Sequence, residues 1–128
     1  MTKSLTTALC SAFVAATLFA SPAARAAANS DRAYNMAVRL MPVIKKCWID
    51  SGDAAFAGYV YSPEPNATNG PRILIVPRTD PSAPPALVIE ISNSGGHVDV
   101  YGPLATSPSA PRISADLRRW LDGSLSCS

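Results

Sequence analysis

Two cysteines near opposite ends of the chain, Cys47 and Cys127, limit the folds that this 128-residue protein can adopt more than any other feature. The third cysteine, Cys10, lies in a segment that we expect to be cleaved off. An even pair of cysteines in an oxidising compartment is typical of a disulfide, whereas a catalytic or metal-binding cysteine needs partner residues. A bond between Cys47 and Cys127 would close a loop of about 80 residues and stabilise the fold by roughly 4 to 5 kcal/mol in the chain-entropy account. We therefore expect the C-terminal residues to be tied to the first helix.

Residues 1–26 have the composition of a secretory signal peptide. Lys3 is the only charge before Arg25, an apolar stretch follows from about Ala8 to Ala20, and small residues surround Arg25. Cleavage before Ala27 would leave one small domain, residues 27–128, in the periplasm or outside the cell. The apolar stretch is short for a membrane span and no later segment is comparable, so we expect no membrane span in the mature chain.

The predicted mature chain has no net charge. The full sequence has 11 Lys and Arg against 9 Asp and Glu, and removal of Lys3 and Arg25 leaves equal numbers. A chain without a basic patch lacks the electrostatic signature of proteins that bind nucleic acid or anionic lipid. We expect neither as a partner.

An apolar pattern with three-and-four spacing predicts a first helix. Asn29 and Ser30 are suited to cap its start, and the Cys47-Trp48 pair would lie in its last turn. Pro42 interrupts the pattern, because a proline inside a helix removes a hydrogen bond and crowds the preceding turn. We expect either a kink near Pro42 or two short helices. The apolar positions are Tyr34, Ala37, Val38, Met41, Ile44 and Trp48.

Four strands are expected to follow, at Ala55–Ser62, Arg72–Arg78, Ala86–Ser92 and His97–Gly102. The second reads RILIVP and is apolar on both faces, which is typical of a central strand. Turn residues separate the strands, including the SPEPNATNGP connection between the first two. The Asn66-Ala67-Thr68 triplet in that connection has the form of a glycosylation site, but we interpret it as turn composition.

The third and fourth strands predict a hairpin whose register depends on its turn. A two-residue Gly95-Gly96 turn places Glu90 opposite Tyr101. A shifted pairing keeps the same core face but places Glu90 opposite Asp99, and like charges directly opposite each other are unfavourable. We therefore expect the Gly-Gly turn.

A Pro-rich connection leads to a last helix from about Ser114 to Asp122, with Gly123 as its terminator. The order helix, four strands, helix predicts an α+β two-layer sandwich. In this fold a four-stranded antiparallel meander buries one face beneath an N-terminal and a C-terminal helix. The expected core consists of Trp48, Trp120, Ile73, Ile75, Ile89, Ile91, Leu117 and Leu121.

The segment MAVRLMPVIKKCWIDSG, the strands after it and a late cysteine beyond a terminal amphipathic helix resemble the C-terminal domain of TolA and TonB proteins. The resemblance covers Val38–Trp48 and the order of the elements. Many members of that family continue the Cys-Trp pair with Asn-Pro and have three strands, where this chain has Ile49-Asp50 and four expected strands. The resemblance implies protein-protein contact in the cell envelope, including pairing of a strand with a partner.

The sequence offers few residues for catalysis. A cysteine or serine nucleophile needs a histidine base, and the only histidine is His97. His97, Asp99 and Tyr101 alternate along one strand, and together with Glu90 they predict a polar outer sheet face. Zinc sites need three or four protein ligands, which this face does not supply. We expect no enzymatic activity, no metal and no cofactor.

Two functional hypotheses remain. The first is an interaction or accessory module that contacts an unidentified envelope protein, with Tyr59 and Tyr61 in the first strand as the candidate partner surface. The second is a carrier of a small apolar ligand held between sheet and helices, for which the aliphatic content and the flexible Met36 and Met41 are mild indications. Small domains usually fill that space with side chains, so we rank the interaction module first.

Overall fold

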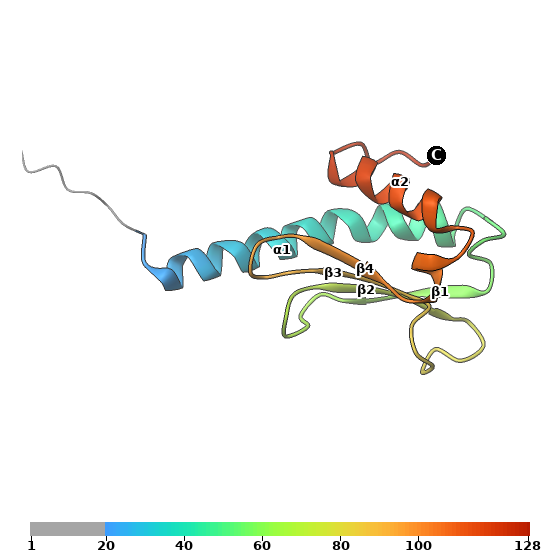
Figure 1. Cartoon of the computed structure of the whole chain (residues 1–128), viewed down its shortest axis with the longest axis horizontal. Coiled ribbons are helices and arrows are strands. Elements are labelled where there is room, and N and C mark those ends of the chain that lie inside the picture. The colour runs from blue at the N-terminus through green and yellow to red at the C-terminus, as the bar shows by residue number, and fades with distance from the viewer. Residues whose placement is uncertain (1–19) are drawn as a thin grey trace, which may run out of the picture.

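The computed structural model describes residues 20–128 (Figure 1). Most of the predicted signal peptide, residues 1–26, therefore lies outside the described residues. The helical elements are α1 (Pro22–Ile44), the π-helical turn η1 (Lys45–Ile49), the 3₁₀ turn η2 (Pro103–Thr106) and α2 (Ala110–Leu121). The strands are β1 (Tyr59–Glu64), β2 (Arg72–Pro77), β3 (Leu87–Ile91) and β4 (Val98–Tyr101). Within residues 20–128, neither helix combines the length and the apolar character that a bilayer crossing requires.

The four strands form one antiparallel sheet in the order β1-β2-β3-β4, which confirms the predicted meander. One face of the sheet is buried at its two central strands, β2 and β3, and these residues share a single core cluster with residues of both helices. Figure 1 shows α1 running along the sheet and α2 beside the C-terminal half of α1. The predicted α+β two-layer sandwich is confirmed. The buried sheet residues are Ile73, Ile75, Leu87, Ile89 and Ile91.

Helix α1 begins at Pro22, well before the predicted caps at Asn29 and Ser30. The Ser21 hydroxyl accepts a hydrogen bond from the Ala24 N–H at 3.3 Å, and Pro22 occupies the first turn. A serine cap, a proline at the start and a run of alanines all favour an early helix start. The first buried residue of α1 is Ala33. Of the described residues, cleavage before Ala27, as predicted, would remove only exposed ones, residues 20–26.

Of the two alternatives predicted at Pro42, a kink or two short helices, the second is wrong, because the first helix is not divided there. The α-helix continues through Pro42 to Ile44, and the irregularity follows it as the π-helical turn. There the Asp50 N–H donates to the Lys45 carbonyl oxygen at 2.9 Å, one residue further than in an α-helix. This wider turn carries Cys47 and Trp48, both of which are buried.

Strand β1 begins at Tyr59 and not at Ala55, because the preceding residues form turns. The Asp53 carboxylate accepts the Ala55 N–H at 2.9 Å, and the Phe56 carbonyl accepts the Tyr59 N–H at 3.0 Å. These turns place Phe56 in the core, where its ring stacks on Trp48 with 4.9 Å between ring centroids and an interplanar angle of 6°. The apolar residues 55–57 therefore belong to a turn in which only Phe56 is buried.

The predicted register of the last hairpin is wrong. Glu90 pairs with Asp99, and Tyr101 pairs with Val88. A two-residue type I′ turn needs positive φ at both central residues, but of the two glycines only Gly96 has it, at 69°. The chain instead makes a longer loop that is closed by hydrogen bonds between Ser92 and residues 96 and 97.

Neighbouring groups compensate the two carboxylates that this register brings together. The Tyr101 side chain reaches diagonally across to β3, where its hydroxyl donates to Glu90 at 3.0 Å. Arg72 pairs with Glu90 from the other side, and His97 Nε2 lies 3.2 Å from the Asp99 carboxylate. The repulsion between Glu90 and Asp99 is therefore offset by these three neighbours. The predicted register considered only the residues directly opposite each other in β3 and β4 and did not include them.

Helix α2 begins at Ala110 and not at Ser114, with Pro111 in its first turn. Part of the connection that we expected to be extended forms η2, which buries Leu104. Leu121, a predicted core residue, is 36% exposed, because it lies about 100° further around the helix than its buried neighbour Trp120. The other predicted core residues are buried.

The disulfide between Cys47 and Cys127 is present, with 5.2 Å between the two Cα atoms. It joins the buried π-helical turn to the exposed C-terminal tail. The tail is also held through its backbone, since the Ser126 carbonyl accepts a hydrogen bond from Trp120 Nε1 at 2.9 Å. The predicted tie between the last residues and the first helix is confirmed.

Asp116 of α2, which the sequence analysis did not single out, is the only buried charged residue of the described part of the chain, at 1% exposure. Its carboxylate accepts a hydrogen bond from Trp48 Nε1 at 2.8 Å and one from Arg119 Nη2 at 2.5 Å. Arg112 lies 3.6 Å away and also pairs with Asp53. One carboxylate therefore links α2, the π-helical turn and the loop before β1.

We expect Asp116→Ala to lower the free energy of unfolding by roughly 2 to 4 kcal/mol, because it leaves the buried Trp48 N–H without an acceptor and removes the ion pair to Arg119. Asp122→Ala, at the exposed end of the same helix, is the control and should change stability by less than about 0.5 kcal/mol. Urea unfolding followed by tryptophan fluorescence measures both. Equal losses in the two variants would contradict the role given to Asp116.

Candidate functional site

The predicted polar sheet face exists as a row of charges that crosses all four strands. The row consists of Glu64, Arg72, Glu90 and Asp99, each paired with the next. Arg72 Nη2 lies 2.6 Å from the Glu64 carboxylate, and this hydrogen bond raises the pKa of the guanidinium above its ordinary value. Partial burial, and then the bond to Glu90, raise the pKa of the Tyr101 phenol. At neutral pH the phenol is therefore a neutral donor.

The β4 end of this face is open to solvent. The side chains of His97 and Asp99 are 61% and 60% exposed, and they contact each other across the strand surface. Residues 20–128 contain no group of three or more His, Cys, Asp or Glu side chains that could hold a metal ion. The sign of the charge alternates from Glu64 to Arg72 to Glu90, but Asp99 has the same sign as Glu90.

Tyr59 and Tyr61, the predicted partner surface, lie on the inner side of β1. Both are half-buried and pack against the core cluster, and burial raises the pKa of Tyr61. β1 is an edge strand, but its free edge offers few hydrogen-bonding groups. The Tyr59 N–H donates to Phe56, the Tyr59 carbonyl accepts from Arg78 Nη2 at 3.0 Å, and Pro63 has no N–H. These are the devices that natural sheets use to block an edge.

The opposite edge, β4, has free backbone groups. The Ser92 N–H donates to the His97 carbonyl at 3.0 Å, which marks that pair as hydrogen-bonded. Because hydrogen-bonded and non-hydrogen-bonded pairs alternate, the N–H and C=O groups of Val98 and Val100 point away from β3. Asp99, Val100 and Tyr101 are all exposed, so the two sides of this edge are accessible.

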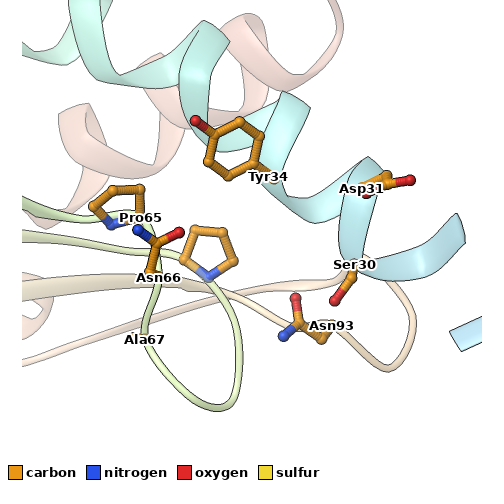
Figure 2. Close-up of a pocket in the computed structure, with 8 residues that line it drawn as sticks. Ser30, Asp31, Tyr34, Pro65, Asn66, Ala67 and Asn93 are labelled. Carbon is orange, nitrogen blue, oxygen red and sulfur yellow. The ribbon is translucent and has the colours of Figure 1, made fainter. Parts of the chain in front are cut away.

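The surface hollows gather at one end of the molecule, where the N-terminal half of α1 meets the loop after β1 and the loop after β3. The hollow drawn in Figure 2 has a volume of about 310 Å³. In this view Tyr34 lies at the top, Ser30 on the right, Asn66 on the left and Asn93 below. We call this region the loop-end site. It is lined by Ser30, Asp31, Tyr34, Pro65, Asn66, Ala67, Pro71 and Asn93.

The two loops of the loop-end site are fixed to each other by backbone hydrogen bonds. The Asn93 N–H donates to the Asn69 carbonyl at 3.1 Å, and the Ile91 N–H donates to the Pro71 carbonyl at 2.9 Å. Between them, Gly70 is buried with φ at +138°, and a Cβ atom there would collide with the Ile91 carbonyl. The loops are therefore an extension of the β2–β3 pairing and hold their shape without a ligand.

The space between sheet and helices is occupied by side chains. Trp48 touches both Phe56 and Trp120, whose ring centroids lie 4.9 and 5.1 Å from its own, and the aliphatic residues of β2 and β3 fill the rest of the core. Met36 and Met41 are half-buried at the margin of this cluster. These contacts give no support to a ligand held between the layers.

Comparison of the chain with protein-family models, with curated proteins and with solved structures found no match. The resemblance to TolA and TonB domains therefore remains a prediction. The sequence analysis also missed the loop-end site, because it read the residues around Asn66 and Asn93 only as turn formers. The excess of amide and hydroxyl side chains in both loops was the signal that pointed to a binding surface.

Gly70→Ala should destabilise the fold by roughly 2 kcal/mol or more, because alanine disfavours this φ and its Cβ would displace the Ile91 carbonyl. Gly58→Ala is the matched control, since a Cβ there has no neighbour within 4 Å and its φ is not positive. Thermal unfolding of the two variants compares them. A Gly70→Ala variant as stable as Gly58→Ala would show that the loops are not rigid.

Proposed function

We propose that the protein is a secreted or periplasmic interaction domain that binds an extended segment of an envelope protein along β4. The observation that carries the proposal is the asymmetry of the two sheet edges. In β1, Pro63 lacks an N–H and the backbone groups of Tyr59 are engaged, which leaves Tyr61 with free outward groups, whereas both Val98 and Val100 of β4 present unpaired backbone donors and acceptors. Addition of a strand to such an edge gives affinity through backbone hydrogen bonds and specificity through alternate side chains.

The charges at this edge indicate the partner that it suits. Along the outer row the signs alternate from Glu64 to Arg72 to Glu90, and Asp99 then repeats the negative sign. A partner strand with Lys or Arg opposite Asp99 would restore the alternation, because opposite charges across a strand pair are stabilising. On the other side of the edge, Val100 is 36% exposed and would favour an aliphatic neighbour.

The compartment in this proposal is supported by the Cys47–Cys127 disulfide, since such bonds persist in oxidising environments. The amino-terminal pattern of a basic residue, an apolar stretch and small residues agrees with export. The TolA and TonB resemblance points in the same direction. An interaction domain needs no catalytic group. The single histidine, His97, lies beside Asp99 on the exposed face of β4.

Export predicts a defined product in the cell that makes the protein. The intact mass under denaturing conditions should correspond to residues 27–128 less two hydrogen atoms, because cleavage falls before Ala27 and the disulfide is formed. Reduction before the measurement should restore the two hydrogens. A full-length or reduced species from the same cells would contradict the proposed compartment.

Strand addition is tested by removing one N–H from the free edge. A photoreactive amino acid in place of Tyr101 should crosslink to the partner in living cells, and Val100→Pro should lower the yield about fivefold, because it removes one hydrogen bond. Val100→Thr keeps the N–H and the shape, so its yield should match that of the parent. Both variants should retain the fold, since the Val100 N–H takes no part in pairing with β3.

Two results would contradict strand addition at β4. One is that Val100→Pro and Val100→Thr lower the crosslinking yield equally. The other is a crosslink that survives both substitutions but disappears with Asp99→Lys alone, which would indicate purely electrostatic contact.

A further inference from the structure

We infer that the loop-end site binds an uncharged saccharide chain. This inference does not depend on the proposed strand addition at β4, which concerns a different surface. The hollow of about 310 Å³ is at the lower end of the volumes of small-molecule sites, roughly 300 to 1,000 Å³. Its lining has a specific chemistry, which identifies the class of ligand.

The polar groups of the lining match hydroxyl groups. Ser30, Asn66 and Asn93 each carry groups that both donate and accept hydrogen bonds, as does the Tyr34 phenol. Their side chains are engaged in none of the hydrogen bonds among residues 20–128. Sugar hydroxyls also donate and accept, so they can pair with Ser30, Asn66 and Asn93, whereas an apolar ligand would leave these three unpaired; the Tyr34 hydroxyl points away from them in Figure 2.

The charges around the hollow argue against an ionic ligand. Asp31 is the only charged residue of its lining, and Figure 2 shows its side chain directed away from Asn66 and Asn93. No arginine or lysine lines this hollow, so a phosphate or carboxylate would find no cation there. A neutral, hydroxyl-rich molecule is the class that remains.

Tyr34 supplies the flat apolar surface that a sugar ring needs. Its side chain is 46% exposed, and in Figure 2 the Asn66 amide points toward the ring. The C–H face of a pyranose can pack on such an aromatic ring while its hydroxyls reach the amides, because tyrosine combines an apolar body with a polar tip. Pro65, Ala67 and Pro71 complete the apolar part of the wall.

The site is rigid and continues on both sides, which suits a chain more than a single sugar. The backbone bonds from Asn93 to Asn69 and from Ile91 to Pro71 fix the loops before binding, so little entropy is lost on association. A smaller hollow adjoins it along residues 67–70, and a more open one adjoins it at Asn29, Asn93 and Ser94, where only the part from Ala27 onward remains after the predicted cleavage. Further sugars of an oligomer would lie there.

The site is suited to binding and not to cleavage of a glycan. Glycosidases place two carboxyl groups on either side of the scissile bond, and the lining of this hollow contains one carboxylate, which points outward. Saccharide binding would hold the domain on an envelope polysaccharide while β4 is free for a protein. The two surfaces lie on different parts of the fold.

The test is a titration of the ¹⁵N-labelled protein with tetramers of N-acetylglucosamine, of β-1,4-linked glucose and of α-1,4-linked glucose. At least one should bind with a Kd of about 1 mM or below, as expected for an open site, and should shift the amide signals of Tyr34, Asn66 and Asn93. Tyr34→Ala should weaken binding tenfold or more, and Asn66→Ala about fivefold, whereas Tyr34→Phe should retain most of the affinity.

Val38→Ala is the matched control, because Val38 is exposed one turn further along the same helix and does not line the hollow. Its affinity should equal that of the parent, and so should that of Val100→Pro at the β4 edge, which separates this test from the test of strand addition. Absence of binding by all three tetramers, or binding that Tyr34→Ala and Asn66→Ala leave unchanged, overturns the inference.

Discussion

The hydrogen bond from Trp48 to the buried carboxylate of Asp116 is the contact on which the arrangement of the helices depends. It joins two elements that are far apart in the sequence, and it satisfies the indole N–H of a fully buried tryptophan. A buried carboxylate is costly unless its partners are in place, and Arg119 and Arg112 supply them. The position of α2 is therefore specified by a directional contact as well as by apolar packing, which alone would allow the helix to slide.

The disulfide acts at the same end of the molecule. Cys47 directly precedes Trp48 in the π-helical turn, so the covalent bond and the polar network fix the same segment. The loops, by contrast, are joined to each other at the far end of the sheet by backbone hydrogen bonds only. The molecule thus has one end that holds the fold together and another where polar side chains are free to bind.

The sequence predicted the features that depend on local pattern. The disulfide, the sheet order and seven of eight core residues followed from cysteine count, turn residues and periodicity. The failures depended on contacts between distant segments. The pairing of Glu90 with Asp99 is tolerated because Arg72, Tyr101 and His97 surround it, and no two-strand comparison includes all three. Leu121 is partly exposed because it lies about 100° beyond Trp120, outside the face of α2 formed by Ile113, Asp116, Leu117 and Trp120.

The candidate surfaces were harder to predict than the core, because they too depend on contacts between segments that are distant in the sequence. Tyr59 and Tyr61 suggested an exposed edge, but alternation along a strand does not say which of its two faces the helices will cover. The loop-end site consists of residues that also favour turns, and only their meeting beside Tyr34 distinguishes a hollow from two ordinary loops. Binding surfaces formed by loops from different parts of the chain have no periodic signature.

The unequal edges of the sheet also set a limit on self-assembly. A sheet with two open edges can add identical copies without end, which is how fibrils grow. Here Pro63 has no N–H to donate, and the Tyr59 N–H and carbonyl are already engaged by Phe56 and Arg78, so a copy that docked on β4 would present a poor second edge for the next. The unequal edges therefore disfavour growth beyond one addition.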